Sequence, residues 1–130
     1  MFKKVDDIPI RVLVVDDERQ IGEFLAEYLN EKGFEVFYAN NGEDAIAFIK
    51  RVRPHITLLD VKMPGMDGIE TLKRIKEVDD KVGVIMITAL QEAGIGRRAM
   101  EYGALDFLSK PVDFEQLETS LMVQLSGMFD

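Results

Sequence analysis

Short apolar runs alternate with amphipathic stretches along the whole chain. The apolar runs are rich in β-branched residues, alternate little with polar ones, and recur about every 20 to 25 residues, as βαβ units require. This pattern predicts a parallel sheet whose strands are covered on both faces. The predicted strands are residues 12–15, 34–38, 56–59, 82–87 and 105–108.

The stretches between these runs carry helical periodicity and helix boundary signals. Apolar residues recur at helical spacing over 21–29, and Gly33 follows as a C-terminal cap. A second helix can start from Asn41. Asp67 and Asp113 each precede a Glu or Gln by three residues, which is the spacing of a capping box. The pattern therefore predicts a helix after each of the first three strands and after the fifth.

The fourth helix is the weakest of the five. Its stretch, Gln91 to Tyr102, contains Gly94 and Gly96. Each glycine costs about 1 kcal/mol relative to alanine in a helix interior. We therefore predict a short, mobile fourth helix, in which amide hydrogen exchange is faster than in the fifth.

An alternating (βα)5 chain with right-handed crossovers makes a doubly wound α/β sheet. The expected architecture is a flavodoxin-like three-layer sandwich around a parallel five-stranded sheet, in the order 2-1-3-4-5. We expect one domain over residues 9–126. Residues 1–8 would form a short irregular N-terminal extension and residues 127–130 a C-terminal tail.

Composition narrows the functional classes. The 130 residues are 47% hydrophobic, carry a net charge of −8 and include no cysteine. Scattered basic residues on an acidic chain argue against direct nucleic-acid binding by this domain. No apolar run is long enough to span a membrane, and the first ten residues do not resemble a signal peptide. A cytoplasmic location is expected, with no disulfide or thiolate metal site.

Polar side chains gather where the predicted strands end. The first strand ends in Asp16-Asp17, the third in Asp60, the fourth in Thr88, and the fifth runs into Ser109-Lys110-Pro111. The second strand exits without charge, as expected if it lies outside the first. Taken singly, an acidic pair before a helix is a common cap, and Asp60 fits ordinary turn chemistry. In the order 2-1-3-4-5, however, the four polar exits are neighbours at the edge where such sheets place their sites.

Three neighbouring carboxylates repel one another and need a cation. Oxygen ligands without histidine or cysteine suit Mg²⁺. Phosphoryl transfer to a carboxylate needs a nucleophile, a divalent ion, a fixed positive charge and a hydrogen-bond donor. Asp60 is the candidate nucleophile, Lys110 the charge and Thr88 the donor, and the small Ala89 leaves its backbone N–H accessible to a phosphate oxygen.

Four segments together resemble the receiver domain of two-component response regulators: "VLVVDDE", "LLDVKMPGMDG", "VIMITA" and "ALDFLSKP". The resemblance covers about residues 9 to 126. It implies a phosphorylation-activated signalling switch in which a sensor histidine kinase donates a phosphoryl group to Asp60. It further implies that Asp17, Asp60 and the backbone carbonyl of Lys62 ligate Mg²⁺, with Asp16 acting mainly through metal-bound water.

The resemblance also assigns a switch and an output. The Thr88 hydroxyl would move toward the phosphoryl group and the Phe107 ring would turn inward, although plain core packing also accounts for a phenylalanine there. Lys110-Pro111 matches a cis-proline step. An output partner or effector domain, and a phosphorylation-dependent homodimer, would use the face of the fourth helix, fifth strand and fifth helix. Such a phosphoprotein catalyses only its own phosphotransfer and autodephosphorylation and is not otherwise an enzyme.

Two alternatives belong to other classes. Haloacid-dehalogenase-type phosphatases share an aspartate nucleophile, Mg²⁺, Thr or Ser and Lys, but Lys62 stands where their general acid would be, and the chain has no room for a cap domain. A flavin-binding module would place phosphate beside the acidic Asp16-Asp17. Both are disfavoured. A further hypothesis is that Leu90 and the long Lys62 side chain hinder a hydrolytic water and so lengthen the phosphoryl lifetime.

Overall fold

The structure is a computed structural model that describes residues 4–5, 8–89 and 93–129. Its five-stranded sheet is built from β3 (Arg11–Val15), β4 (Glu35–Ala39), β5 (Ile56–Asp60), β6 (Gly83–Ala89) and β7 (Asp106–Lys110). The order is β4-β3-β5-β6-β7, and every neighbouring pair is parallel. Counted along the chain this is 2-1-3-4-5, so the predicted flavodoxin-like doubly wound fold is confirmed.

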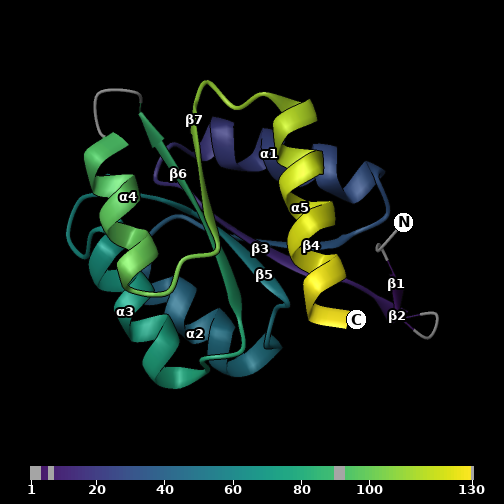
Figure 1. Cartoon of the computed structure of the whole chain (residues 1–130), viewed down its shortest axis with the longest axis horizontal. Coiled ribbons are helices and arrows are strands. Elements are labelled where there is room, and N and C mark those ends of the chain that lie inside the picture. Colours follow the sequence, from purple (N-terminus) through teal and green to yellow (C-terminus); the bar gives the residue numbers. More distant parts are fainter. Residues whose placement is uncertain (1–3, 6–7, 90–92, 130) are drawn as a thin grey trace.

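Helices cover both faces of the sheet (Figure 1). They are α1 (Arg19–Glu31), α2 (Gly42–Val52), α3 (Gly68–Val78), α4 (Ala93–Glu101) and α5 (Phe114–Phe129). One core cluster joins the sheet to α2, α3 and α4, and the other joins it to α1 and α5. All five residues of β5 are buried, as expected for a central strand between two helical layers.

The predicted helix starts are supported by side-chain caps. The Asn41 side chain accepts from the backbone N–H of Asp44, and the Asp67 side chain accepts from Glu70 at 2.9 Å. Asp113 accepts from the backbone N–H groups of Glu115 and Gln116 at the start of α5. These bonds satisfy amide groups that have no partner within the first helical turn. Gly33 has φ 101° after α1, the conformation of a C-terminal glycine cap.

Regular secondary structure extends further toward both ends of the chain than the sequence pattern predicts. The N-terminal segment was expected to be irregular, yet β1 (Lys4–Val5) and β2 (Ile8–Pro9) form a small antiparallel ladder. Strands of two residues are too short to show a periodic pattern, so the sequence did not reveal this ladder. α5 continues to Phe129. The expected start of the fourth helix at Gln91 lies outside the described residues.

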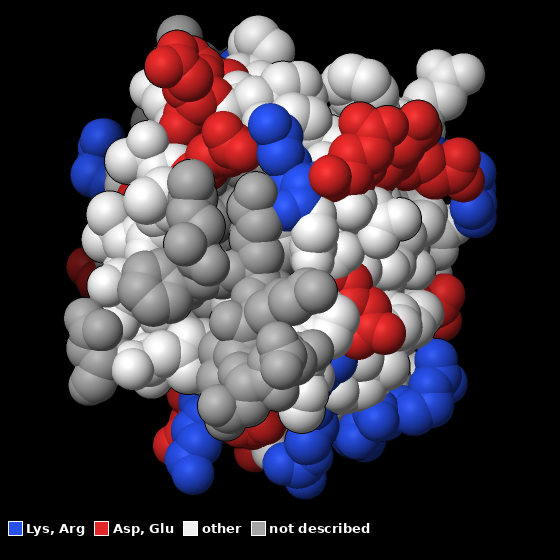
Figure 2. All heavy atoms as spheres, turned by 90° about the vertical axis from the view of Figure 1, so that its right-hand side faces the viewer, with Lys and Arg blue, Asp and Glu red and all other residues white. Residues whose placement is uncertain are grey.

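Charge is distributed unevenly over the surface. Figure 2 shows the face that lies on the right-hand side of Figure 1. Its acidic side chains are mainly toward the upper edge and its basic side chains mainly toward the lower edge. The upper edge is the one at which β6 and β7 end in Figure 1. Within the described residues, no helix combines the length and apolarity that crossing a membrane requires.

Candidate functional site

The end of β3 places Asp16 and Asp17 at the carboxyl edge of the sheet. Asp16 is buried and Asp17 is exposed. The backbone N–H of Asp16 donates to the Ala39 carbonyl at 3.2 Å, which extends the β3–β4 pairing by one residue. The Asp16 carboxylate accepts from the backbone N–H of Glu18 at 2.9 Å, and the Tyr38 hydroxyl donates to the Asp16 carbonyl at 2.6 Å. The turn is therefore held at its backbone and at its side chain.

Asp60 is the last residue of β5, and it is only 4% exposed. The backbone N–H of Lys62 lies 3.4 Å from one Asp60 carboxylate oxygen, toward which it donates. After Asp60 the chain turns back tightly, because Gly68 donates to the Val61 carbonyl at 2.8 Å. A Cβ at Gly68 would collide with the Asp60 carbonyl oxygen, so only glycine permits this close return. Gly65, with φ 74°, supplies the left-handed residue of the turn.

Lys110, the last residue of β7, brings a positive charge to the carboxylates. Its Nζ lies 3.1 Å from Asp60 Oδ2 and 3.4 Å from Asp16 Oδ2. Glu18 Oε1 is farther, at 4.0 Å. Lys110 is 50 positions from Asp60 in the chain, and β6 lies between their strands, so the sheet order and the long lysine side chain together bring the two groups into contact. The predicted cis peptide between Lys110 and Pro111 is present.

Thr88 and Ala89 end the strand that lies between β5 and β7. Asp60 pairs with Ile87 and Thr88 with Ser109, so Thr88 stands one position beyond the level of Asp60. Thr88 is fully buried, and its hydroxyl donates to the Ala89 carbonyl at 3.2 Å. The Phe107 ring is partly buried against the core cluster of α2, α3 and α4. The structure thus brings the predicted switch pair to adjacent strands.

The electrostatics single out Asp60. Burial raises the pKa of its carboxyl from 3.8 to about 6, even though the hydrogen bond and charge of Lys110 act in the opposite direction. The nearby Asp16 raises it further. Burial alone would lower the pKa of Lys110, but its hydrogen bond to Asp60 and the charges of Asp60 and Asp16 raise it above its ordinary value. Burial therefore disfavours the ionised form of Asp60, whereas the neighbouring Lys110 ammonium keeps its charge at neutral pH.

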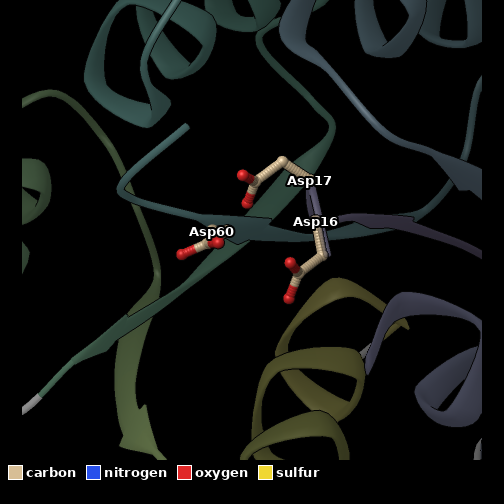
Figure 3. Close-up of side chains that lie close together, drawn as sticks. All are labelled: Asp16, Asp17 and Asp60. Atoms are coloured by element: carbon tan, nitrogen blue, oxygen red, sulfur yellow. The ribbon is translucent and has the colours of Figure 1, made fainter. Parts of the chain in front are cut away.

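Three carboxylates meet in one place. Asp16, Asp17 and Asp60 each offer an oxygen within 4.8 Å of the others. Figure 3 shows these side chains close together at the ends of β3 and β5. An oxygen-only donor set with one exposed member fits Mg²⁺, which retains several waters when it binds proteins. The backbone carbonyl of Lys62 follows Asp60 by two residues and is the additional predicted ligand.

The sequence predicts site residues Asp16, Asp17, Asp60, Thr88 and Lys110 because each is a polar residue at a strand end. The structure brings Asp16, Asp17, Asp60 and Lys110 together. The sequence did not reveal Glu18 and Tyr38. Tyr38 reads as an ordinary aromatic residue of a strand, and no local pattern reveals that its hydroxyl reaches the Asp16 carbonyl. Lys62 is exposed. Leu90 lies outside the described residues, so the proposed hindrance of hydrolysis by these two side chains stays a prediction.

His55, the one histidine of the chain, lies away from this cluster. It precedes β5, and its Nδ1 accepts from the backbone N–H of Arg11 at 3.0 Å. Burial lowers the pKa of the imidazole, and the charge of Arg11 lowers it further. A neutral histidine bonded to backbone at the amino end of the sheet indicates a structural role.

A family model described as response regulator receiver domain matches residues 12–122. The chain is 40% identical to sporulation initiation phosphotransferase F of Bacillus subtilis (strain 168), over 85% of this chain and 90% of that protein. It is 37% identical to the regulatory protein AtoC of Escherichia coli (strain K12), over 88% of this chain but only 24% of AtoC.

Solved structures give the same likeness. The receiver domain of NtrX from Brucella abortus matches with a TM-score of 0.84 and 31% identity, covering 88% of this chain and 98% of that one. The CheX-CheY-BeF3-Mg+2 complex from Borrelia burgdorferi matches with a TM-score of 0.85 and 34% identity, covering 91% of this chain and 90% of that one.

Proposed function

The chain belongs to the response regulator receiver domain family, and we propose that Asp60 is the residue on which it accepts a phosphoryl group from a sensor histidine kinase. The observation that carries the proposal is the position of Asp60: a buried carboxylate, 3.1 Å from Lys110, within a cluster of three acids at the ends of neighbouring strands. A receiver domain is a phosphoacceptor and regulator and not a classical enzyme.

In the transfer, an Asp60 carboxylate oxygen bonds to phosphorus while the bond from phosphorus to the kinase's imidazole nitrogen breaks. The imidazole leaves with the bonding electron pair. The Lys110 ammonium donates to one Asp60 oxygen. It can shift to a phosphoryl oxygen as negative charge is transferred there. The rigid strand β5 fixes the nucleophile, so little reorganisation is needed for attack.

Asp16, Asp17, Asp60 and the Lys62 carbonyl are the residues that would hold Mg²⁺. When bound, the ion neutralises negative charge on the carboxylates and on the phosphoryl oxygens. The CheX-CheY complex from Borrelia burgdorferi contains BeF3 and Mg²⁺, which supports this role for the corresponding site here. Asp16 is already bonded to Lys110 and to the Glu18 N–H, which suits a contribution through metal-bound water.

Thr88, Ala89 and Phe107 would convert phosphorylation into a change of shape. We assign the Thr88 hydroxyl and the Ala89 backbone N–H to the phosphoryl oxygens. Since Thr88 Oγ1 now donates to the Ala89 carbonyl, it must rotate to reach them. Phe107 would follow into the space behind Thr88. The altered face, made by α4, β7 and α5, would bind an output partner or a second copy of the chain.

The receiver domain proper is assigned to residues 9–126, with residues 1–8 as an extension and 127–130 as a tail. The chain spans 90% of one curated relative and about a quarter of another, so it fits either a stand-alone regulator or a receiver within a longer protein. We assign the domain to the cytoplasm, with no direct contact with nucleic acid or membrane, in keeping with its net charge of −8.

Incubation with acetyl phosphate tests the proposal. With Mg²⁺, the intact protein should gain the mass of one phosphoryl group, and hydroxylamine should remove it, as expected of an acyl phosphate. Without Mg²⁺ the gain should be much slower. Asp60→Asn should take up nothing, whereas Asp106→Asn, the same change on a carboxylate of β7 that accepts from Ser120, should behave as wild type.

Uptake by Asp60→Asn at the wild-type rate would refute the assignment. Turnover of an unrelated phosphate ester by the wild-type chain would instead favour the haloacid-dehalogenase-type phosphatase, against which the match to the receiver family over residues 12–122 already argues.

A further inference from the structure

Tyr38 reaches across to the acidic turn from the neighbouring strand. It pairs with Val14 in the β3–β4 ladder, two residues before Asp16. Its hydroxyl nevertheless donates to the Asp16 backbone carbonyl at 2.6 Å, because the side chain extends along the strand direction toward the carboxyl edge. A phenol hydroxyl is protonated at neutral pH and can donate this bond.

Helix α1 is shaped to receive the Tyr38 ring. Gly22 is buried where the helix crosses β4, and a Cβ at that position would collide with the ring carbon Cε1 of Tyr38. The Arg19 guanidinium lies 5.5 Å from the ring centroid on the same helix. The missing side chain of Gly22 therefore gives the ring the room that its hydroxyl needs to reach Asp16.

The bonded carbonyl belongs to the peptide that joins Asp16 to Asp17. Because a peptide unit is planar, holding the Asp16 oxygen also orients the amide of Asp17 and the direction in which its side chain leaves the backbone. The Asp16 N–H is bonded to Ala39, and the Asp16 carboxylate accepts from Glu18. The Tyr38 bond fixes the one remaining polar group of Asp16.

We propose that Tyr38 is a positioning residue for the divalent cation, which it affects by orienting the peptide between Asp16 and Asp17, and that Gly22 makes this contact possible. The inference rests on the proposed function, since it presupposes a metal held by these acids. Asp17 is exposed, so the orientation of its backbone strongly affects where its carboxylate points.

Calorimetric titration of the metal-free protein with MgCl₂ tests the inference through the dissociation constant. Tyr38→Phe keeps the ring and removes only the hydroxyl, so the fold should persist. The dissociation constant for Mg²⁺ should rise about tenfold, the lower end of the loss that follows removal of other outer partners of metal ligands. Tyr102→Phe, the same change beside Lys73 and beyond α4, is the matched control and should leave it unchanged.

Unfolding by urea, measured on the same variants, separates positioning from plain stability. A merely structural hydroxyl would lower the urea midpoint of unfolding and leave the dissociation constant within about twofold of wild type. That result would overturn this inference but not the proposed function. If the wild-type protein bound no Mg²⁺, the proposed function would fail, and this inference with it.

Gly22→Ala provides a second, independent perturbation. Its methyl group should push the ring aside and weaken Mg²⁺ binding by a similar factor. Because both changes break the same bond, the double variant should bind about as weakly as either single one. If the dissociation constant of the double variant rose by the product of the two single factors, the two residues would act separately. That result would contradict the shared contact.

Discussion

Asp60 is held in the folded protein at a cost in stability. Its carboxyl binds a proton more tightly when folded, with a pKa of about 6 against an ordinary value of 3.8. The folded state therefore holds more protons than the unfolded state between about pH 4 and pH 6, and the free energy of unfolding falls as pH rises through that window. Above it the full penalty applies, about 2 to 3 kcal/mol.

Removing this charge should stabilise the metal-free protein. We predict that Asp60→Asn raises the free energy of unfolding by about 2 kcal/mol near pH 7, since a neutral amide is buried at less cost than a carboxylate. Near pH 4 the gain should largely vanish. Urea denaturation of both proteins near pH 7 and near pH 4 measures the difference in unfolding free energy at each pH. An Asn variant no more stable than wild type at neutral pH would contradict the assigned burial cost.

Thr57 is a second residue that is buried at a cost in stability. Among the described residues, the Oγ1 of Thr57 in β5 is a buried side-chain atom without a hydrogen-bond partner. Thr57→Val replaces this hydroxyl with a methyl group of the same shape and should stabilise the protein by about 1 kcal/mol. The change in urea midpoint measures it.

Thr71 provides the control for this prediction. It is equally buried, but its Oγ1 donates to the Asp67 carbonyl at 2.8 Å. Thr71→Val should therefore destabilise the protein by about 1 kcal/mol, because it removes an existing hydrogen bond. Changes of the same sign in the two variants would refute the account.

At the scale of elements, α4 contains two glycines with different surroundings. A Cβ at Gly94 would meet nothing within 4 Å, whereas a Cβ at Gly96 would lie 2.9 Å from Phe107 Cδ2 and 3.3 Å from Thr88 Cγ2. The sequence suggested only that both weaken the helix. The structure places Gly96 against the two residues of the predicted switch pair, so its small size keeps α4 close to β6 and β7.

Alanine at each position should separate these roles. Gly94→Ala should stabilise the protein by about 0.5 to 1 kcal/mol through helix propensity, with phosphorylation unchanged. Gly96→Ala should lose this gain, because its methyl group must displace the Phe107 ring, and the ring resonances of Phe107 should shift in the NMR spectrum. Equal stabilisation by both variants, with an unmoved ring, would show that the contact with Phe107 is not tight.

The elements could be predicted where their causes are local. Strand positions followed from apolar runs, and the starts of α3 and α5 from the caps Asp67 and Asp113. The site residues could be found because a parallel sheet brings strand ends together, which is a property of the fold. Contacts between side chains of separate elements, such as Tyr38 with Asp16 or Gly96 with Phe107, have no local signature and required the structure.

At the scale of the whole molecule, two apolar clusters hold the sheet between helical layers, while the charged site is confined to one edge. This division keeps the charged groups of the edge apart from the apolar clusters. Phosphorylation of Asp60 would replace one acid by a group of greater charge beside Lys110, and the strands β6 and β7 would carry the response to the face of α4 and α5.

Chemical trapping of the phosphoryl group identifies the side chain that carries it, which we propose to be Asp60. Borohydride reduces an acyl phosphate of aspartate to homoserine, which is stable to proteolysis and peptide sequencing. After phosphorylation with acetyl phosphate and Mg²⁺, we predict homoserine at position 60 and at no other position. Homoserine at Asp16 or Asp17, or an unmodified Asp60 in protein that has gained a phosphoryl group, would contradict the account.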